Sequence, residues 1–334
     1  MRAWRDVSRT ALPIAVMTAV GFTLTLYVFY PGVMTFDARY VYQDIAKGFY
    51  GDWQSPVMTL LWSVIDPIAP GPGSLLLLTV TLYWLAFGVL ALAVARRSPR
   101  LALLLPLLAL SPPAFVFVGI IWRDVLFATS WLLAAATAFA AAGCGWKARV
   151  PAQALALGLL AFGFLLRPNA LAAAPILAAF ILWPSRFYWK YAAIVYLPAA
   201  IGLYGLLQVV YYDVLGATRQ QPLHSIMVFD LGGISHFAKD NVFPGSWSSK
   251  ESKLITEGCY KPIAWDIYWT QEPCSFVMAR LEGAKVWLAR TDGGMEECDC
   301  EPSPRLSSAP RRIHVGFPEP SQSHHVDHGP RRYV

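Results

Sequence analysis

Charged side chains are scarce in this chain. Only 14% of its 334 residues are Asp, Glu, Lys or Arg, whereas 56% are hydrophobic. A soluble globular domain has about a quarter charged residues, so this composition excludes an ordinary soluble enzyme. The high apolar content also excludes an intrinsically disordered chain and a collagen-like fibre. We therefore expect a membrane protein whose main surroundings are the lipid bilayer.

The shortage of charge is confined to the first two thirds of the sequence. Residues 1–212 contain 14 basic and 6 acidic residues, whereas residues 213–334 contain 13 basic and 15 acidic ones. The first part is therefore net positive and the second net negative. No basic run is interleaved with aromatic residues on a polar segment, so we expect no nucleic-acid partner. The first part is expected to lie in the bilayer and the second in water.

Seven apolar segments are candidates for membrane spans, because a helical span needs about 20 apolar residues. They are Ala11–Tyr30, Leu75–Ala95, Leu101–Ile121, Val125–Ala142, Pro151–Leu166, Ala170–Trp183 and Tyr191–Tyr212. The fifth and sixth are short, and Pro168 between them breaks a helix, so they form either a tight hairpin or a re-entrant pair. The expected fold class is an all-α polytopic membrane protein with about seven spans.

Basic residues predict the orientation of these spans. With the N-terminus in the cytoplasm, 10 of the 14 basic residues before residue 213 fall in cytoplasmic loops, as the positive-inside rule requires. Every acidic residue of that region except Asp6 then lies on the outer side. Because the number of spans is odd, everything after Tyr212 is expected outside the cytoplasm.

The chain divides into three parts by composition. Residues 1–212 form the expected transmembrane core, whose first outer loop covers residues 31–73. Residues 213–290 have mixed charge, scattered Gly and Pro and many aromatic residues, which indicates a small extracytoplasmic domain. Residues 291–334 contain six Pro, five Arg, no Lys and no apolar run, so we expect a disordered tail there.

Cysteines are few, and two of the five fall in the expected extracytoplasmic domain. Cys259 and Cys274 lie where oxidation is feasible, and the sequence leaves open whether they form a disulfide. The two cysteines of the tail have C-x-C spacing without a second cluster, which is poor evidence for zinc. The His324–His328 tract, HHVDH, is more typical of an incidental tail, so no metal site is predicted.

The polar side chains before residue 234 gather on the expected outer side. The first outer loop holds Asp37, Asp44, Asp52 and Gln54, the second is only Trp122–Asp124, the third is Arg167–Asn169, and the outer domain opens with Arg219–Gly233. The chain lacks a P-loop, an H-E-x-x-H motif and a G-x-S-x-G motif. No other catalytic motif therefore competes with this polar face.

These residue types suit one kind of chemistry. A carboxylate such as Asp37 can accept a proton from a hydroxyl, and Arg123 and Arg167 at the same level can hold a lipid phosphate as it leaves. Sugar transfer from a polyprenyl-phosphate donor needs this combination at a membrane surface. Plainer alternatives stay open for each residue alone: a solvated loop carboxylate, a snorkelling Arg paired with Asp124, and an ordinary helix end.

Four segments resemble the bacterial GT-C membrane glycosyltransferases, which include the protein mannosyltransferases and lipid A aminoarabinose transferase. The segments are PGVMTFDARYVYQDIAKGFYGDWQSPV, WRDVLFATSWLL, FLLRPNAL and HSIMVFDLGGIS, and the resemblance covers about residues 10–290. It implies a GT-C-like helical core in the bacterial inner membrane, with Asp37 as the general base. By the same resemblance, donor phosphate or acceptor is bound by Arg123, Asp124, Arg167, Asp44, Gln54 and His224.

The resemblance also implies the reaction. A sugar moves from a polyprenyl-phosphate-linked donor to a hydroxyl of a lipid, glycan or protein acceptor, with inversion, because no second carboxylate is assigned as nucleophile. Gln54 stands where such enzymes often have a His, so no His role is expected there. It stays open whether Asp44 or Asp124 orients the acceptor or a divalent metal, although no cluster of metal ligands indicates a cofactor.

Two departures leave other functions open. GT-C enzymes commonly have further spans after this point, and the change of composition at residue 291 suggests a truncated or frameshifted product without activity. A non-catalytic membrane assembly or scaffold protein is therefore one alternative. A glycolipid transporter is the other, although it would place polar residues near the bilayer midplane in broken helices.

Overall fold

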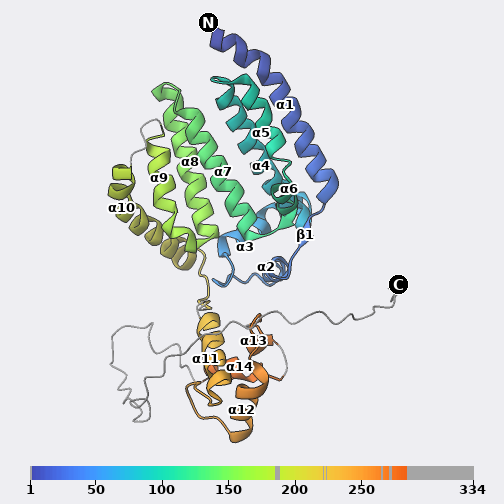
Figure 1. Cartoon of the computed structure of the whole chain (residues 1–334), viewed down its shortest axis with the longest axis vertical. Coiled ribbons are helices and arrows are strands. Elements are labelled where there is room, and N and C mark those ends of the chain that lie inside the picture. Colours follow the sequence, from blue (N-terminus) through green and yellow to red (C-terminus); the bar gives the residue numbers. More distant parts are fainter. Residues whose placement is uncertain are drawn as a thin grey trace, which may run out of the picture. The chain divides into compact units, whose positions relative to one another are not determined.

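The computed structural model describes residues 2–184, 189–220, 222, 224–264, 266–270 and 273–283, and most of them are helical (Figure 1). The expected tail of residues 291–334 lies outside the described residues. The described chain forms two compact units. One contains the residues up to Ile234 and Tyr260–Trp265, and the other contains Ser235–Cys259 and the residues from Asp266 on.

Five helices are long and apolar enough to cross a membrane. They are α1 (Arg2–Phe29), α4 (Pro72–Ala95), α7 (Arg123–Ala141), α8 (Trp146–Leu166) and α10 (Trp189–Gln208), which continues into the π-helical turn η3 (Val209–Val214). A sixth candidate is the pair α5 (Pro99–Leu108) and α6 (Pro112–Val118), which is bent by 55°. The described residues thus have the fold class expected from the sequence, an all-α polytopic membrane protein.

The sixth expected span, residues 170–183, is not one long helix. It consists of the 3-10 turn η2 (Pro168–Ala172) and α9 (Ala174–Leu182), which has nine residues. A span needs about 17–25 residues. Gln153 of α8 donates hydrogen bonds to the last carbonyls of α9, at 2.8 Å to Ile181 and 3.0 Å to Leu182. By length and composition, five helices, or six with the bent pair, are candidate spans, and the expected number of seven stays a prediction.

Local sequence signals explain where several helices begin and end. Proline stands in the first turn of α3 (Pro56–Ile65), α4, α5 and α6, where its missing N–H has no carbonyl to bond. The hydroxyl of Thr35 caps α2 (Phe36–Lys47) by accepting from the N–H of Ala38. The same helix ends at Gly48, whose φ of 62° favours glycine.

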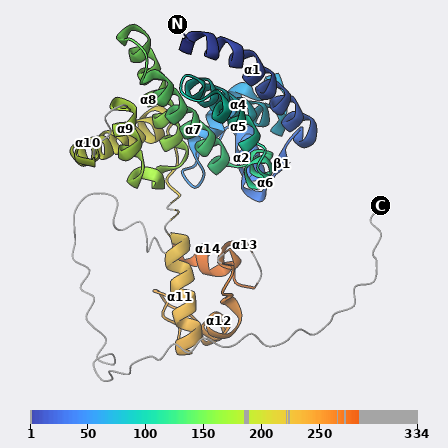
Figure 2. The same cartoon turned by 45° about the horizontal axis from the view of Figure 1, so that its top comes forward.

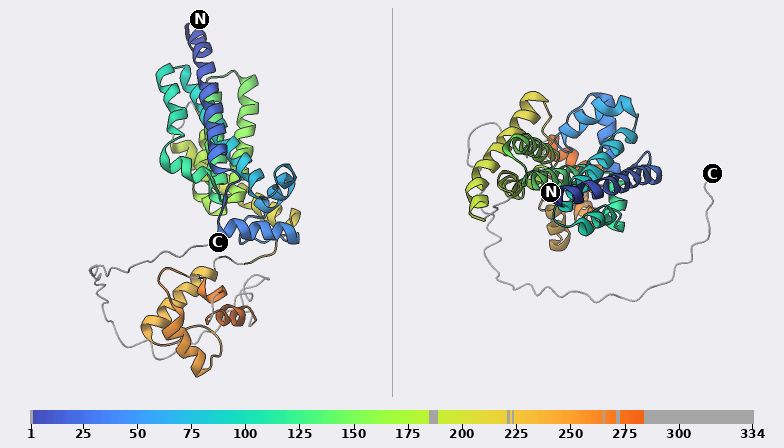
Figure 3. Two further views of the ribbon diagram at one scale, coloured as in Figure 1. Left: turned by 90° about the vertical axis from the view of Figure 1, so that its right-hand side faces the viewer. Right: turned by 90° about the horizontal axis from the view of Figure 1, so that it is seen from above.

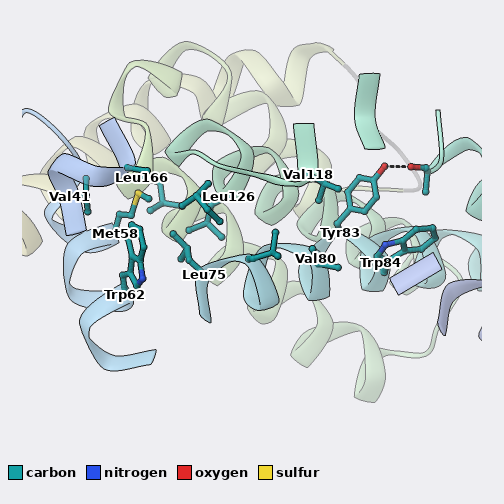
Figure 4. Packing of buried hydrophobic residues seen from close by; sticks show 14 residues of the cluster. Val41, Met58, Trp62, Leu75, Val80, Tyr83, Trp84, Val118, Leu126 and Leu166 are labelled. Atoms are coloured by element: carbon teal, nitrogen blue, oxygen red, sulfur yellow. Dashed lines mark hydrogen bonds between the residues drawn. The ribbon is translucent and has the colours of Figure 1, made fainter. Parts of the chain in front are cut away.

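The centre of the first unit is the helix α4. It packs against α1 and α5 on one side and against α7 on the other, and α7 packs against α8 (Figure 2). Its buried side chains join those of α2, α3, α6 and α7 in one apolar cluster (Figure 4). In that cluster the Tyr83 hydroxyl donates a 2.6 Å hydrogen bond to the carbonyl of Ala109. The core thus connects the helices that carry the polar loops.

Small residues let the helices approach closely, as is usual between membrane helices. Gly21 of α1 lies directly against the Trp84 ring of α4, because a Cβ there would be only 2.0 Å from that ring. The indole N–H of Trp84 donates to the Thr25 hydroxyl at 2.9 Å. Gly163 of α8 lies in the same way against Trp131 of α7.

The polar loops meet at one end of the first unit, away from the N-terminus (Figure 3). Strand β1 (Val33–Met34) pairs in parallel with β2 (Ile120–Ile121), with Val33 opposite Ile120. Thr218 bridges to Gly51, and the Ser55 hydroxyl donates to the carbonyl of Leu165 at 2.9 Å. These contacts bring the ends of α1, α8 and η3 and the start of α7 together, so the expected outer loops share one end of the bundle.

The second unit is built from short helices. They are the last residues of α11 (His224–Ala238), then α12 (Ser249–Leu254), the π-helical turn η4 (Ile255–Cys259), α13 (Ile267–Thr270) and α14 (Phe276–Gly283). A disulfide joins Cys259 to Cys274. Glu251 completes a capping box with Ser248 and forms a 2.6 Å ion pair with Arg280. The boundary between the units falls in α11, later than the expected residue 212, because residues 211–220 are bonded to the first loop.

Candidate functional site

A cavity of about 350 Å³ lies at the polar end of the first unit. Four elements form it: α2, the segment from Gln54 to α3, the start of α7 and the end of α8. Five of the residues singled out in the sequence line it, namely Asp37, Gln54, Arg123, Asp124 and Arg167. The structure therefore assembles residues that are up to 130 positions apart in the sequence into one polar pocket.

The two guanidinium groups of this pocket differ in their partners. Arg167 follows the last residue of α8, and its Nε forms a 2.7 Å ion pair with Asp124. Arg123 is the first residue of α7 and makes one long hydrogen bond, 3.4 Å from Nη1 to the carbonyl of Trp53. Its buried Nε has no partner among the described residues. Arg123 thus has no carboxylate within ion-pair distance among the described residues, whereas Arg167 has one.

The start of α7 adds further donors beside Arg123. The residue before the helix, Trp122, makes no side-chain capping bond, and its carbonyl accepts from the N–H groups of Val125 and Leu126, so an anion at the helix start would meet the N–H groups of Arg123 and Asp124. An uncapped helix N-terminus carries a partial positive charge and attracts anions. Because Arg123 and this helix start coincide, we expect an anionic group to bind at this wall of the pocket.

Asp37 lies in the first turn of α2 and lines the same pocket with an exposed side chain. Its carboxylate has no hydrogen bond or ion pair with any described residue. It lies close enough to Arg123 for an electrostatic interaction. A carboxylate that is exposed and unpaired is free to accept a proton from a hydroxyl that comes within hydrogen-bond distance of it.

An apolar cavity of about 340 Å³ adjoins the polar pocket. Side chains of α4, α6 and α7 line it, and it shares the residues Trp122 and Asp124 with the pocket. Trp122 stacks on Phe117 of α6, with 6.5 Å between the ring centroids. The sequence predictions missed this cavity, because hydropathy identifies the helices but does not show where their side chains leave a gap.

Bonds between distant segments fix the loop that carries Gln54. The carboxylate of Asp52 accepts from the Tyr212 hydroxyl at 2.9 Å and from the N–H of Gln220 at 2.6 Å. The side-chain oxygen of Gln220 accepts from the N–H of Trp53 at 3.0 Å. The Tyr211 hydroxyl donates to the carbonyl of Leu165. No local sequence signal reveals these partners, which are about 160 positions apart for Asp52 and Tyr212.

Two expected site residues are not in the pocket. Asp44 lies on the buried face of α2, where its side chain is 6% exposed. Burial raises its pKa above the ordinary value, and the nearby charge of Lys47 opposes that shift. His224 is the first residue of α11 and does not line the pocket. Among the described residues, no group of three or more His, Cys, Asp or Glu side chains has the arrangement of a metal site.

No protein-family model matches the chain, and neither a curated protein nor a solved structure matches it significantly. The fold and the pocket therefore define the chain only as an all-α membrane protein with a polar pocket beside an apolar cavity.

Proposed function

We propose that the chain is a membrane glycosyltransferase that moves a sugar from a polyprenyl-phosphate-linked donor to a hydroxyl of a lipid, glycan or protein acceptor. One observation carries the proposal: the polar pocket and the apolar cavity share Trp122 and Asp124. A polyprenyl phosphate is an amphiphile with an anionic head, and the two adjoining cavities match its two parts. The resemblance to GT-C enzymes supports the same assignment.

In this proposal the phosphate binds against Arg123 and the start of α7. The guanidinium of Arg123 makes one long hydrogen bond, from Nη1, which leaves donors of a charged group for the phosphate, and charge-assisted bonds to phosphate are stronger than neutral ones. The polyprenyl chain extends into the apolar cavity between α4, α6 and α7. Arg167, already paired with Asp124, sets the position of that carboxylate at the boundary of the two cavities.

Asp37 accepts the proton of the acceptor hydroxyl as the reaction proceeds. The acceptor oxygen forms a bond to the anomeric carbon, and the bond from that carbon to the phosphate oxygen breaks, so the configuration inverts. The leaving group is the polyprenyl phosphate, and the cationic donors of Arg123 stabilise its developing charge. The step needs neither a metal nor a second nucleophile.

We place the reaction on the outer face of a bacterial inner membrane. The positive-inside rule puts the N-terminus in the cytoplasm, and the polar end of the bundle lies away from it. The disulfide between Cys259 and Cys274 supports an oxidising compartment for the segment after the last span, because cytosolic thiols are kept reduced.

The test replaces Asp37 by Asn in the native host and measures surface glycan and lipid modification by mass spectrometry at matched protein level. The modification in question is the one that a deletion of the gene abolishes. Its amount is expected to fall by at least about 100-fold in the Asp37→Asn variant, as is typical when a general base is removed. Asp213→Asn is the matched control, because Asp213 is exposed and outside the pocket. Full modification by the Asp37→Asn variant contradicts the proposal and favours a scaffold.

A further inference from the structure

The carboxamide of Gln54 is an almost buried, uncharged polar group of the pocket. Its side chain is only 8% exposed and lines the polar cavity. It has no hydrogen-bond partner among the described residues, yet its polar atoms are not fully enclosed by protein. A buried amide without partners is unfavourable. Its bonds are therefore expected to be made to water in the free protein and to a ligand in the complex.

The backbone on both sides of Gln54 is fixed before any ligand binds. On one side, Trp53 donates its N–H to Gln220 and accepts at its carbonyl from Arg123. On the other side, the Ser55 hydroxyl accepts from the N–H of Met58 and donates to the carbonyl of Leu165. A site whose groups are held in place loses less entropy on binding and discriminates better between ligands. Gln54 is thus a preorganised group rather than a mobile loop residue.

The chemistry of an amide indicates what it binds. A carboxamide has an acceptor oxygen and an NH₂ donor, whereas phosphate oxygens only accept, so a phosphate would leave the amide oxygen unpaired. A sugar hydroxyl donates and accepts, and two neighbouring hydroxyls satisfy both ends of the amide. The positively charged donors of the pocket are on Arg123 and Arg167, which are the better partners for phosphate.

We propose that Gln54 recognises hydroxyl groups of the sugar carried by the lipid phosphate, and so determines which sugar the pocket accepts. This inference rests on the proposed function and assigns a substrate part to one residue. In this proposal Arg123 binds the phosphate, the apolar cavity binds the polyprenyl chain, and Gln54 binds the sugar. The three contacts belong to different walls of the two adjoining cavities, so they are separable by substitution.

The test measures lipid binding to the full-length protein by native mass spectrometry. The probes are undecaprenyl monophosphate and its esters with glucose, mannose and arabinose. Wild-type protein is expected to bind at least one sugar ester about tenfold more tightly than the bare monophosphate, as is typical of sites that pair a buried polar group with a substrate hydroxyl. Gln54→Leu, which keeps the volume but not the amide, is expected to remove that advantage and leave monophosphate binding unchanged.

The control is Gln43→Leu, the same change at an exposed position of α2 outside the pocket. It is expected to keep the preference for the sugar ester, and equal melting temperatures of both variants show that the fold is intact. Three results overturn the inference. The Gln54→Leu variant retains the preference for the sugar ester, or it loses monophosphate binding as much as sugar-ester binding, or the wild-type protein prefers no sugar ester. Absence of monophosphate binding by the wild type overturns the proposed function as well, which separates the two failures.

Discussion

Four carboxylates at the polar end have four different environments. Asp37 is exposed and unpaired in the pocket, whereas Asp124 is neutralised by Arg167. Asp52 is bonded to Tyr212 of η3 and to Gln220 of the segment after it, and so connects both to the loop. Asp44 is buried in α2 and does not line the pocket. The same side-chain type is therefore exposed, ion-paired, hydrogen-bonded or buried according to its surroundings, and only the exposed Asp37 has the role of base in the proposed reaction.

Asp44 gives a prediction about pH. Burial raises its pKa in the folded protein, so the ionised form is less favourable in the folded than in the unfolded chain, and stability falls as the pH rises through that pKa. We expect Asp44→Asn to raise the melting temperature at pH 7 and to have less effect near pH 4, measured by thermal unfolding in detergent. Asp213→Asn, at an exposed position, serves as the control. A variant that melts lower than wild type at pH 7 contradicts this environment.

At the scale of the elements, close helix packing supports the site. α1 and α7 both pack on α4, and β1 after α1 pairs with β2 before α7. The distance between α1 and α4 depends on Gly21, which faces the Trp84 ring. The packing of the span and the geometry of the pocket are thus connected by two short elements.

Gly21→Ala tests this packing. The added methyl group overlaps the Trp84 ring, and overpacking of this kind costs about 1–3 kcal/mol. Gly202→Ala is the matched control, because nothing lies within 4 Å of its Cβ position on α10 and alanine is a better helix former than glycine. Thermal unfolding in detergent is expected to show a lower melting temperature for Gly21→Ala alone. Equal melting of both variants contradicts a packing role for Gly21.

At the scale of the whole molecule, the disulfide of the second unit bears on the side of the membrane where that unit lies. The disulfide between Cys259 and Cys274 closes a segment with a sequence separation of 15. Loops of that size gain about 3 kcal/mol from a disulfide, chiefly by restricting the unfolded chain. The disulfide is therefore expected to stabilise the second unit, and it agrees with the proposed orientation, in which this unit lies outside the cytoplasm.

The double substitution Cys259→Ser and Cys274→Ser tests this. We expect it to lower the free energy of unfolding of the second unit by about 3 kcal/mol, measured by protease resistance of intact protein in spheroplasts. In the wild-type protein, a membrane-impermeant thiol reagent should label Cys259 and Cys274 of intact cells only after the disulfide has been reduced. Free thiols that react solely after the membrane is opened would place the second unit in the cytoplasm and contradict the proposed orientation.

Composition and hydropathy predicted much of the fold and part of the site. The apolar runs predicted the five long helices, because a span has to be long and continuously apolar, but not the 55° bend between α5 and α6. They also indicated the break at Pro168, where the structure has η2 followed by the short helix α9. Charge placement predicted the polar pocket, since ionisable groups are costly inside a bilayer.

The missing parts of the site depend on long-range contacts. The role of Asp52 depends on Tyr212 and Gln220, which no local pattern connects to it. The apolar cavity depends on the gap that α4, α6 and α7 leave beside Trp122. The lack of hydrogen-bond partners for the Gln54 side chain depends on the positions of all the side chains around it. Such features arise from packing in three dimensions, so a linear sequence does not reveal them.

The most direct test of the central claim is the binding of undecaprenyl monophosphate to the purified protein by native mass spectrometry. Two variants address the two cavities: Arg123→Gln for the phosphate, and Ala128→Trp, which fills the apolar cavity. Each is expected to weaken binding by at least about tenfold, while Ala193→Trp, an exposed position of α10, leaves it unchanged. Binding as tight as that of wild type in both cavity variants would contradict the claim that the adjoining cavities hold a lipid phosphate.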